Sequence, residues 1–143
     1  MRYLGFDLGT RSLGISISDT TRTVASTYKT IRFSEKDYDS LIPQIKEIIE
    51  QFNVSKIILG LPKNMNNSLG DRSIETLEFK EKLENNFGIE VIMQDERLTT
   101  VEANNYMLKA DISRKKRKEK IDSLAANIIL QTYLDKERRN NNV

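Results

Sequence analysis

Three acidic positions in this sequence suggest chemistry, because each places a carboxylate where an apolar residue is expected. Asp7 interrupts the alternating segment RYLGFDL, and the pair Asp95–Glu96 ends the apolar segment IEVIM. Asp122 precedes a run of apolar residues on the same predicted helical face. Carboxylates that gather at one place repel one another unless cations lie between them, and Mg²⁺ or Mn²⁺ suits such ligands. A pair of such ions can activate water and stabilise the leaving oxygen in phosphodiester cleavage.

Each of these acidic residues also has a structural interpretation. Asp7 could form a turn, and Asp95–Glu96 could complement the N-terminus of a helix. Asp122 could cap the helix that begins there. The choice between the two interpretations depends on whether the fold brings the three positions together.

The residue types that the chain lacks narrow its chemistry. The 143 residues include neither histidine nor cysteine. This composition excludes Ser-His and Cys-His nucleophiles, imidazole or thiolate metal ligands and disulfides within this chain. Any metal bound by these side chains is therefore expected to be a hard, oxygen-binding cation.

Positive charge is concentrated in one stretch, although the net charge is only +2. The segment KADISRKKRKEK, residues 109–120, contains seven Lys or Arg and two acidic residues. Such a patch can bind the phosphate backbone of a nucleic acid. The residues predicted to do so are Lys115, Lys116, Arg117 and Lys118. The alternative is a solvated loop followed by a helix start.

Hydrophobic periodicity predicts the elements that would position these residues. Alternation predicts strands over 2–8, 13–19 and 23–33, and the short joins between them are typical of hairpins. Buried strands are predicted over 54–62 and 89–96, and helices over 38–52, 74–87, 100–109 and 116–138.

This order predicts an α/β fold with a five-stranded mixed sheet flanked by helices. The first three strands form an antiparallel meander, and right-handed crossovers make the fourth and fifth strands parallel to the first. The carboxyl ends of the first, fourth and fifth strands then meet at one edge, where open α/β sheets bind ligands. We expect one domain over 1–138 and a polar tail over 139–143.

Glycines and a proline accompany the acidic residues at this edge. Gly9 follows the first strand, and Gly60 and Pro62 end the fourth. We expect these residues to shape substrate-binding loops, with Gly9 and Gly14 leaving space beside the scissile phosphate. The chain has no apolar run of the ~20 residues that would span a bilayer and no signal-peptide pattern. We therefore expect a cytoplasmic protein that does not bind membranes.

Several sequence blocks together resemble those of one family. The blocks FDLGTRSLGISISD, GLPKNMNNSLGDRS, DERLTTVEA, SRKKRKEKID and DSLAANIILQTYL are similar to successive motifs of the YqgF/RuvX family, over residues 2 to 134. This family has an RNase H-like fold and is described as Holliday junction resolvases or as pre-16S rRNA nucleases. The resemblance implies acidic catalytic and metal-binding residues at Asp7, Glu96 and Asp122, and arginines that contact nucleic acid at Arg11 and Arg97. The chain departs from the family pattern at Asn67, where a glycine is usual.

The function that these observations predict is a divalent-metal nuclease acting on RNA. The resemblance points to the 5′ end of pre-16S rRNA, with the pre-ribosome as a partner. The same site could instead cut a four-way DNA junction. Two further readings stay open: a non-catalytic RNA-binding factor in ribosome assembly, and nucleotide binding through DLGT, which resembles a phosphate loop of sugar kinases.

Overall fold

The computed structural model of the chain describes residues 1–61, 71–95 and 114–141, with side chains placed for 1–61, 73–94 and 124–138. Its strands are β1 (Arg2–Leu8), β2 (Ser12–Ser18), β3 (Ala25–Arg32), β4 (Val54–Leu61) and β5 (Glu90–Asp95). Its helices are the 3-10 helix η1 (Tyr38–Ser40) and the α-helices α1 (Leu41–Phe52), α2 (Asp71–Phe87) and α4 (Arg114–Asn141).

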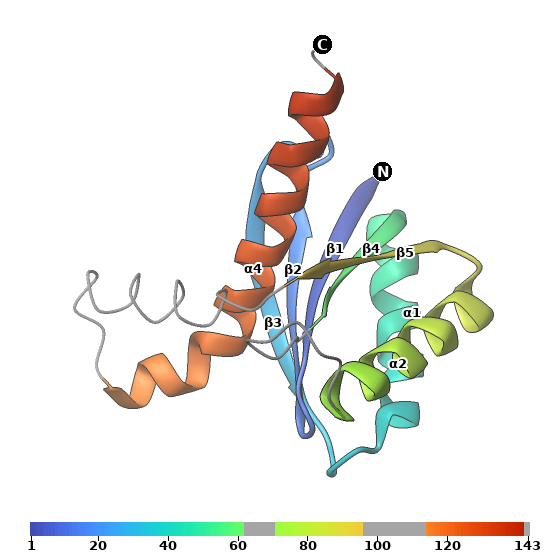
Figure 1. Ribbon diagram of the computed structural model, residues 1–143, viewed down its shortest axis with the longest axis vertical. Coiled ribbons are helices and arrows are strands. Elements are labelled where there is room, and N and C mark those ends of the chain that lie inside the picture. The colour runs from blue at the N-terminus through green and yellow to red at the C-terminus, as the bar shows by residue number, and fades with distance from the viewer. Residues whose placement is uncertain (62–70, 96–113, 142–143) are drawn as a thin grey trace.

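The five strands form one mixed sheet in the order β3-β2-β1-β4-β5 (Figure 1). β2 is antiparallel to both β1 and β3, whereas β4 is parallel to β1 and β5 is parallel to β4. The predicted meander and the two parallel crossovers are therefore confirmed. The order of connection switches between β1 and β4, which places the predicted site at the topological switch point.

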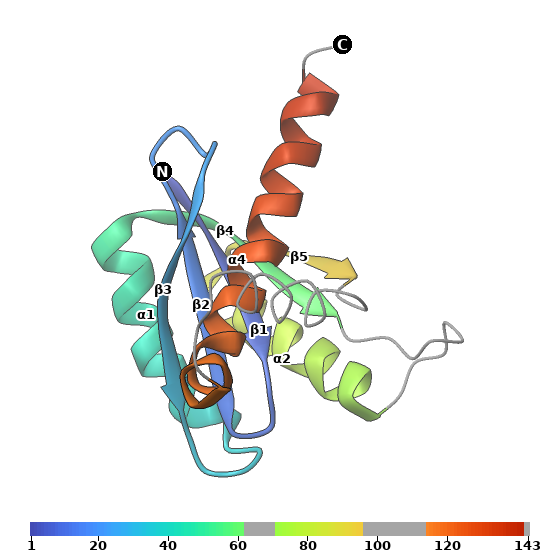
Figure 2. The same ribbon diagram turned by 90° about the vertical axis from the view of Figure 1, so that its left-hand side faces the viewer.

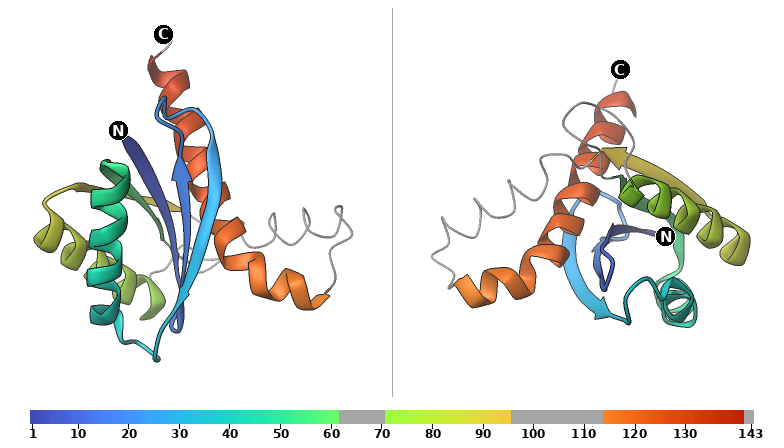
Figure 3. Two further views of the ribbon diagram at one scale, coloured as in Figure 1. Left: turned by 180° about the vertical axis from the view of Figure 1, so that it is seen from behind. Right: turned by 60° about the horizontal axis from the view of Figure 1, so that its bottom comes forward.

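Helices cover both faces of the sheet. Figure 3 shows α1 and α2 on one face and α4 crossing the other. The first turns of α4 extend beyond β3 before the helix crosses the sheet, and its last turns extend past the opposite end (Figures 2 and 3). Two layers of helix around one sheet give strands β1, β2 and β4 two buried faces, whereas the edge strand β3 has mostly exposed or half-buried residues.

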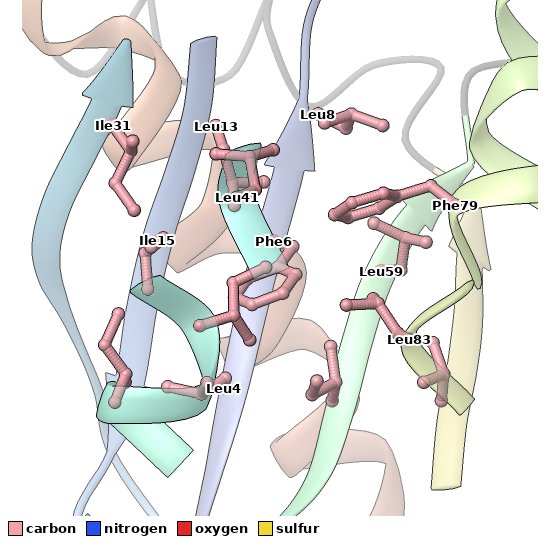
Figure 4. Close-up of a cluster of buried hydrophobic side chains, with 14 of the residues drawn as sticks. Leu4, Phe6, Leu8, Leu13, Ile15, Ile31, Leu41, Leu59, Phe79 and Leu83 are labelled. Carbon is pink, nitrogen blue, oxygen red and sulfur yellow. The ribbon is translucent and has the colours of Figure 1, made fainter. Parts of the chain in front are cut away.

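The larger core lies between the sheet and helices α1 and α2. Figure 4 shows Phe6 of β1 at its centre, with Leu59 from β4 and Phe79 from α2 beside it. The residues Leu4, Leu13, Ile15, Leu41 and Leu83 are also fully buried in this core. Apolar side chains of this size each contribute about 1.5–3 kcal/mol when fully buried, so this face supplies most of the hydrophobic stabilisation.

A smaller core lies between the sheet and α4. It contains Tyr3, Ala25 and Ile58 from the sheet, and Ile129, Leu130 and Leu134 from α4. Alternation along β1 and β4 assigns neighbouring residues to opposite faces, as a pleated strand requires. The α4 face is therefore the face on which Asp7 lies, because Asp7, Gly5 and Tyr3 share one parity in β1.

Left-handed residues end two of the helices. Asn53 has φ of 53° and follows α1, and its N–H donates to the carbonyl of Ile49. Gly88 has φ of 64° and follows α2, and its N–H donates to the carbonyl of Glu84 at 2.9 Å. The predicted glycine stop of the second helix is therefore confirmed, and it follows the common left-handed helix ending.

The last helix differs in length from its prediction. α4 begins at Arg114 and ends at Asn141, two residues before and three residues after the predicted bounds. It therefore runs into the segment expected to be a polar tail. The predicted helix over 100–109 lies outside the described residues. Among the helices that the structure describes, none is long and apolar enough to cross a membrane.

Candidate active site

Asp7 lies at the carboxyl end of β1, one residue before the strand ends. It is half-buried on the α4 face of the sheet, and its register partner on β2 is Gly14. On the other side, the preceding residue Phe6 pairs with Leu59, so Asp7 is level with Gly60 of β4. The residue directly opposite Asp7 on β2 thus contributes no side chain to the space beside the carboxylate.

Gly5 explains how α4 comes close to this strand. A Cβ atom on Gly5 would lie 2.3 Å from the Ser16 Oγ, 2.7 Å from the Leu130 Cβ and 2.8 Å from the carbonyl oxygen of Ala126. The Ser16 hydroxyl donates a hydrogen bond of 2.8 Å to the same Ala126 carbonyl. Only glycine at this position allows the helix backbone to rest on the strand, so one of the glycines around Asp7 provides clearance for α4.

The direction of α4 brings residue 122 toward Asp7. Ala126 contacts Gly5, and further along the helix Tyr133 stacks against Tyr3 with ring centroids 6.2 Å apart. α4 therefore runs antiparallel to β1. Asp122 lies about one helical turn before Ala126, which is about 6 Å along the helix. Asp7 lies two residues after Gly5, which is about 7 Å along the strand in the same direction. The backbone register places these two positions at the same level.

The β1–β2 turn, which carries Gly9 and Arg11, has a defined backbone. The Gly9 N–H donates to the carbonyl of Ser12 at 2.7 Å. A Cβ on Gly9 would lie 3.3 Å from that carbonyl oxygen and from the Ser12 hydroxyl. The turn is also fixed to the segment after β3, because the N–H groups of Phe33 and Lys36 donate to the carbonyls of Arg11 and Thr10.

The Arg11 side chain is 72% exposed and forms a 3.4 Å ion pair with Glu35, which is 57% exposed. A pair this exposed contributes little to stability and can exchange partners, because water screens both charges. Lys115, Lys116, Arg117 and Lys118 lie in the first turns of α4. The basic stretch is thus helical from Arg114 onward, which fits the helix-start alternative as well as a binding role.

The remaining predicted residues are only partly covered. Gly60 pairs with Gln94 near the ends of β4 and β5. Asp95 pairs with Leu61 at the backbone level, and its side chain is outside the described part of the chain. Pro62, Glu96 and Arg97 lie outside the described residues. Parallel pairing nonetheless brings the carboxyl ends of β1, β4 and β5 to one edge, as the sequence predicted.

The donor chemistry at this edge suits a hard divalent cation. Asp7 supplies oxygen donors at a half-buried position, opposite Gly14, which has no side chain. Within the side chains that the structure describes, no group of three potential metal ligands is present. A complete Mg²⁺ or Mn²⁺ site at Asp7 therefore needs residues beyond these. The acidic candidates are Asp122, which belongs to α4, and Glu96, which directly follows β5 in the sequence.

A second polar cluster, which the sequence did not predict, lies at the opposite edge of the α4 face. Lys56 of β4 donates to the Tyr133 hydroxyl at 3.1 Å and to Glu137 at 3.4 Å. The hydroxyls of Tyr133 and Tyr3 both donate to the Glu137 carboxylate, at 2.9 and 3.2 Å. The Lys56 ammonium also lies 4.9 Å from the centre of the Tyr3 ring, within cation–π range.

Burial and hydrogen bonding act in opposite directions on the charges of this cluster. Burial disfavours the charged form of Lys56, but the hydrogen bond to Tyr133 and the neighbouring Tyr3 and Glu137 raise its pKa above the ordinary value. Burial also opposes the Glu137 carboxylate, yet the Tyr133 hydroxyl and the Lys56 charge lower its pKa overall. Burial raises the pKa of Tyr133. The Lys56 ammonium and the Glu137 carboxylate are thus held as an ion pair by neutral tyrosine hydroxyls, and the cluster anchors the last turns of α4.

Comparisons with known proteins were consistent over nearly the whole chain. The family model described as "RuvX: Holliday junction resolvase" matches residues 1–136. A protein from Thermoanaerobacter pseudethanolicus with the curated name "Putative pre-16S rRNA nuclease" is 48% identical over 141 residues, covering 96% of this chain and 99% of the relative. A Bacillus mycoides protein of the same name is 45% identical over 135 residues, covering 94% and 98%.

Solved structures show the same architecture at low sequence identity. Thermus thermophilus RuvC in complex with Holliday junction substrate matches with a TM-score of 0.60 at 14% identity, covering 96% of each chain. The fowlpox virus resolvase with Holliday junction DNA matches with a TM-score of 0.59 at 12% identity, covering 96% of this chain and 99% of that chain. At these identities the likeness concerns the fold, and it confirms the RNase H-like expectation.

Proposed function

The chain belongs to the RuvX family, and from that premise we propose that it is a divalent-metal-dependent nuclease that processes the 5′ end of pre-16S rRNA. The observation that carries this proposal is the level register of Asp7 with residue 122 of α4 across the Gly5–Ala126 contact. This register supports a site in which two acidic positions far apart in the sequence act together at the switch point of the sheet, where a phosphodiester substrate would bind.

We assign the metal-binding and catalytic roles to Asp7, Glu96 and Asp122. In β5, Ile92 packs on the α4 side of the sheet, whereas Met93 packs on the α1 side. The parity of Ile92 favours Glu96 over Asp95 as the β5 contribution to a site on the α4 face.

The chain's own groups would hold the substrate around that centre. Arg11 and Arg97 would contact phosphates, and the basic residues 115–118 would bind the nucleic-acid backbone. Gly9, Gly60 and Pro62 would shape the adjoining loops. When bound, Mg²⁺ or Mn²⁺ would activate water and stabilise the leaving oxygen, which is chemistry that carboxylates alone do not supply.

The alternative substrate within the same activity is a four-way DNA junction. The family description and the junction-bound T. thermophilus and fowlpox virus structures favour it. The names of the relatives at 48% and 45% identity favour pre-16S rRNA. We give RNA precedence because those relatives are far more similar in sequence. A pre-ribosome as partner and the cytoplasm as location follow from this substrate and belong to the same proposal.

A side-by-side cleavage assay tests the proposal. The wild-type protein and Asp7→Asn are offered a pre-16S rRNA 5′-leader fragment and a four-way DNA junction, with Mg²⁺, with Mn²⁺ and with chelator. We expect metal-dependent RNA cleavage that falls about 10³-fold or more in Asp7→Asn, because the loss removes a metal ligand from the transition state. Thermal unfolding of the two proteins checks that Asp7→Asn is folded.

Each outcome selects one interpretation. Preferred cutting of the junction would transfer the proposal to DNA. RNA binding without cutting, unaffected by Asp7→Asn, would overturn the nuclease proposal in favour of a non-catalytic assembly factor. Thermal stabilisation by ATP in the absence of cleavage would instead favour nucleotide binding.

A further inference from the structure

The α4 face of β2 carries only small residues, while its other face is fully apolar. Ser16 and Ser18 use their hydroxyls at the covered part of this face, accepting from or donating to groups of the backbone. Toward the β1–β2 turn the same face continues through Gly14 to Ser12. Because the side chains of β2 on this face are so short, a ligand here would mainly contact long side chains from the neighbouring elements.

The register shows which residue of β3 reaches this part of the face. Gly14 pairs with Thr30, and Ser12 pairs with Arg32. Ile31 belongs to the core on the α1 side, so Arg32 lies on the α4 side, like Ser12. β3 runs parallel in direction to β1, and Arg32 therefore lies at the same edge of the sheet as Asp7.

The Arg32 side chain is exposed and has no ion pair or hydrogen-bond partner among the described residues. The partner of Arg32 on β2 is Ser12. The adjoining Arg11, in the β1–β2 turn, lies opposite Phe33, whose N–H donates a 3.0 Å hydrogen bond to the Arg11 carbonyl. Two exposed arginines thus stand on adjacent backbones, one unpaired and the other held only by the exposed Glu35.

We propose that Arg32 binds a phosphate of the substrate strand that leads into the Asp7 site, and that the same strand displaces Glu35 from Arg11 in the adjoining turn. The inference rests on the proposed nuclease function, because the phosphate belongs to the same nucleic-acid substrate. Arginine suits this task, since its planar fork forms two parallel hydrogen bonds with a phosphate.

The geometry of the sheet sets where that phosphate lies. Two strand spacings across and two residues along separate the Cα atoms of Asp7 and Arg32, which is roughly 12 Å. At about 3.4 Å of rise per nucleotide, this distance corresponds to three or four nucleotides along one strand. Arg32 therefore contacts a phosphate flanking the scissile one, so it is a positioning residue and not a catalytic one.

The experiment measures binding and cleavage separately. Binding of the pre-16S 5′-leader RNA and of the four-way DNA junction is measured over a range of salt concentrations in the Asp7→Asn background, which isolates affinity from turnover. The variants are Arg32→Gln, Arg32→Lys and Glu35→Gln. The control is Arg138→Gln, which removes another exposed arginine, from the far end of α4, where it pairs with Asp135. Steady-state cleavage is measured with Asp7 intact.

We expect Arg32→Gln to weaken binding about 5-fold at moderate salt and to reduce the slope of log affinity against log salt by about one contact. KM should rise while kcat stays within about twofold. Arg32→Lys should restore the salt slope but only part of the affinity. Glu35→Gln should strengthen binding about 2-fold, because it frees Arg11 for the substrate. Arg138→Gln should match the parent.

Unchanged affinity and salt slope in Arg32→Gln, with the parent still binding and cutting, would overturn this inference alone. Equal losses in Arg32→Gln and Arg138→Gln would also overturn it, because the effect would then reflect overall charge. A parent that neither binds nor cuts either substrate would instead overturn the proposed function, so the two failures are distinguishable.

Discussion

The two edges of the α4 face each carry a cation, and these two cations differ in their exposure and in their interaction partners. Lys56 is only 17% exposed and has two hydrogen-bond acceptors and two aromatic rings around it. Arg32 at the other edge is exposed and has no partner within the described residues. A satisfied, partly buried charge fixes the structure, whereas an exposed, unsatisfied one is available to a ligand. The comparison separates an edge that anchors α4 from the edge at which we propose that substrate binds.

The contact between these two edges should be the most sensitive position. Gly5→Ala places a Cβ against the Ser16 hydroxyl, the Leu130 side chain and the Ala126 backbone. We expect a loss of about 3 kcal/mol in the free energy of unfolding, because a backbone carbonyl cannot move aside as a flexible side chain can. Denaturant unfolding measures this loss. Gly9→Ala is the control: its Cβ would be 3.3 Å from the nearest atoms, and less than about 1 kcal/mol should be lost.

Equal losses of unfolding free energy in Gly5→Ala and Gly9→Ala would contradict this expectation, because they would mean that α4 does not pack closely on β1. A second measurement is the cleavage activity of Gly5→Ala at temperatures where the protein is folded, and a loss of activity there would link the two edges. That result would show that the position of α4 controls the site.

Lys56→Met tests the anchoring edge. It keeps the length of the side chain but leaves Glu137 without its cation, so we expect a loss of about 2 kcal/mol in unfolding free energy. The control is Lys80→Met, which removes a partly exposed i,i+4 pair with Glu84 on α2 and should cost less than about 0.5 kcal/mol. Both variants should retain the nucleic-acid affinity and salt slope of the parent. Weakened binding in Lys56→Met, without a matching loss of stability, would contradict the division between the edges.

The smallest expected effect concerns acid pH at the anchoring edge. Hydrogen bonds from the Thr21 hydroxyl and from the Thr23 and Val24 N–H groups lower the pKa of Asp19 from 3.8 to about 2. A lowered folded-state pKa contributes stability above the unfolded value, and this stability is lost as pH falls through the folded value. The difference in Tm between wild type and Asp19→Asn should therefore be largest above pH 5 and should vanish near pH 2. A difference that is constant with pH would show that the carboxylate charge is not involved.

Most of the fold could be predicted from the sequence because its periodicities are strong. Alternation around Leu4 and Phe6 defined the first strand, and the crossover rule gave the parallel neighbours. The start of β3 at Ala25, two residues later than predicted, could not be read from β-branched residues alone. The Asp19 side chain accepts hydrogen bonds from Thr23 and Val24 and thereby holds them in a turn.

The candidate site was only partly accessible from sequence. The position of Asp7 followed from strand order, but the reason for Gly5 did not, because close approach of α4 is a tertiary contact. Arg32 was overlooked although its parity opposite to Ile31 is visible in the sequence. The strand bulge beside Ile15 and Ser16 shifts the register further along β3, so faces cannot be counted along the whole strand. Lys56 gave no signal, since its partners are about 80 residues away.

The position of α4 after all five strands also sets an order of events during synthesis. A growing chain can pair β1 to β5 before α4 exists, but until then Tyr3 and Ile58 have no helix to cover them. The proposed site also depends on the docking of α4, because residue 122 comes level with Asp7 only when Ala126 packs against Gly5. An enzyme that cuts the RNA of the ribosome would thus be made as an incomplete sheet, without activity, and would become competent only when its last helix docks.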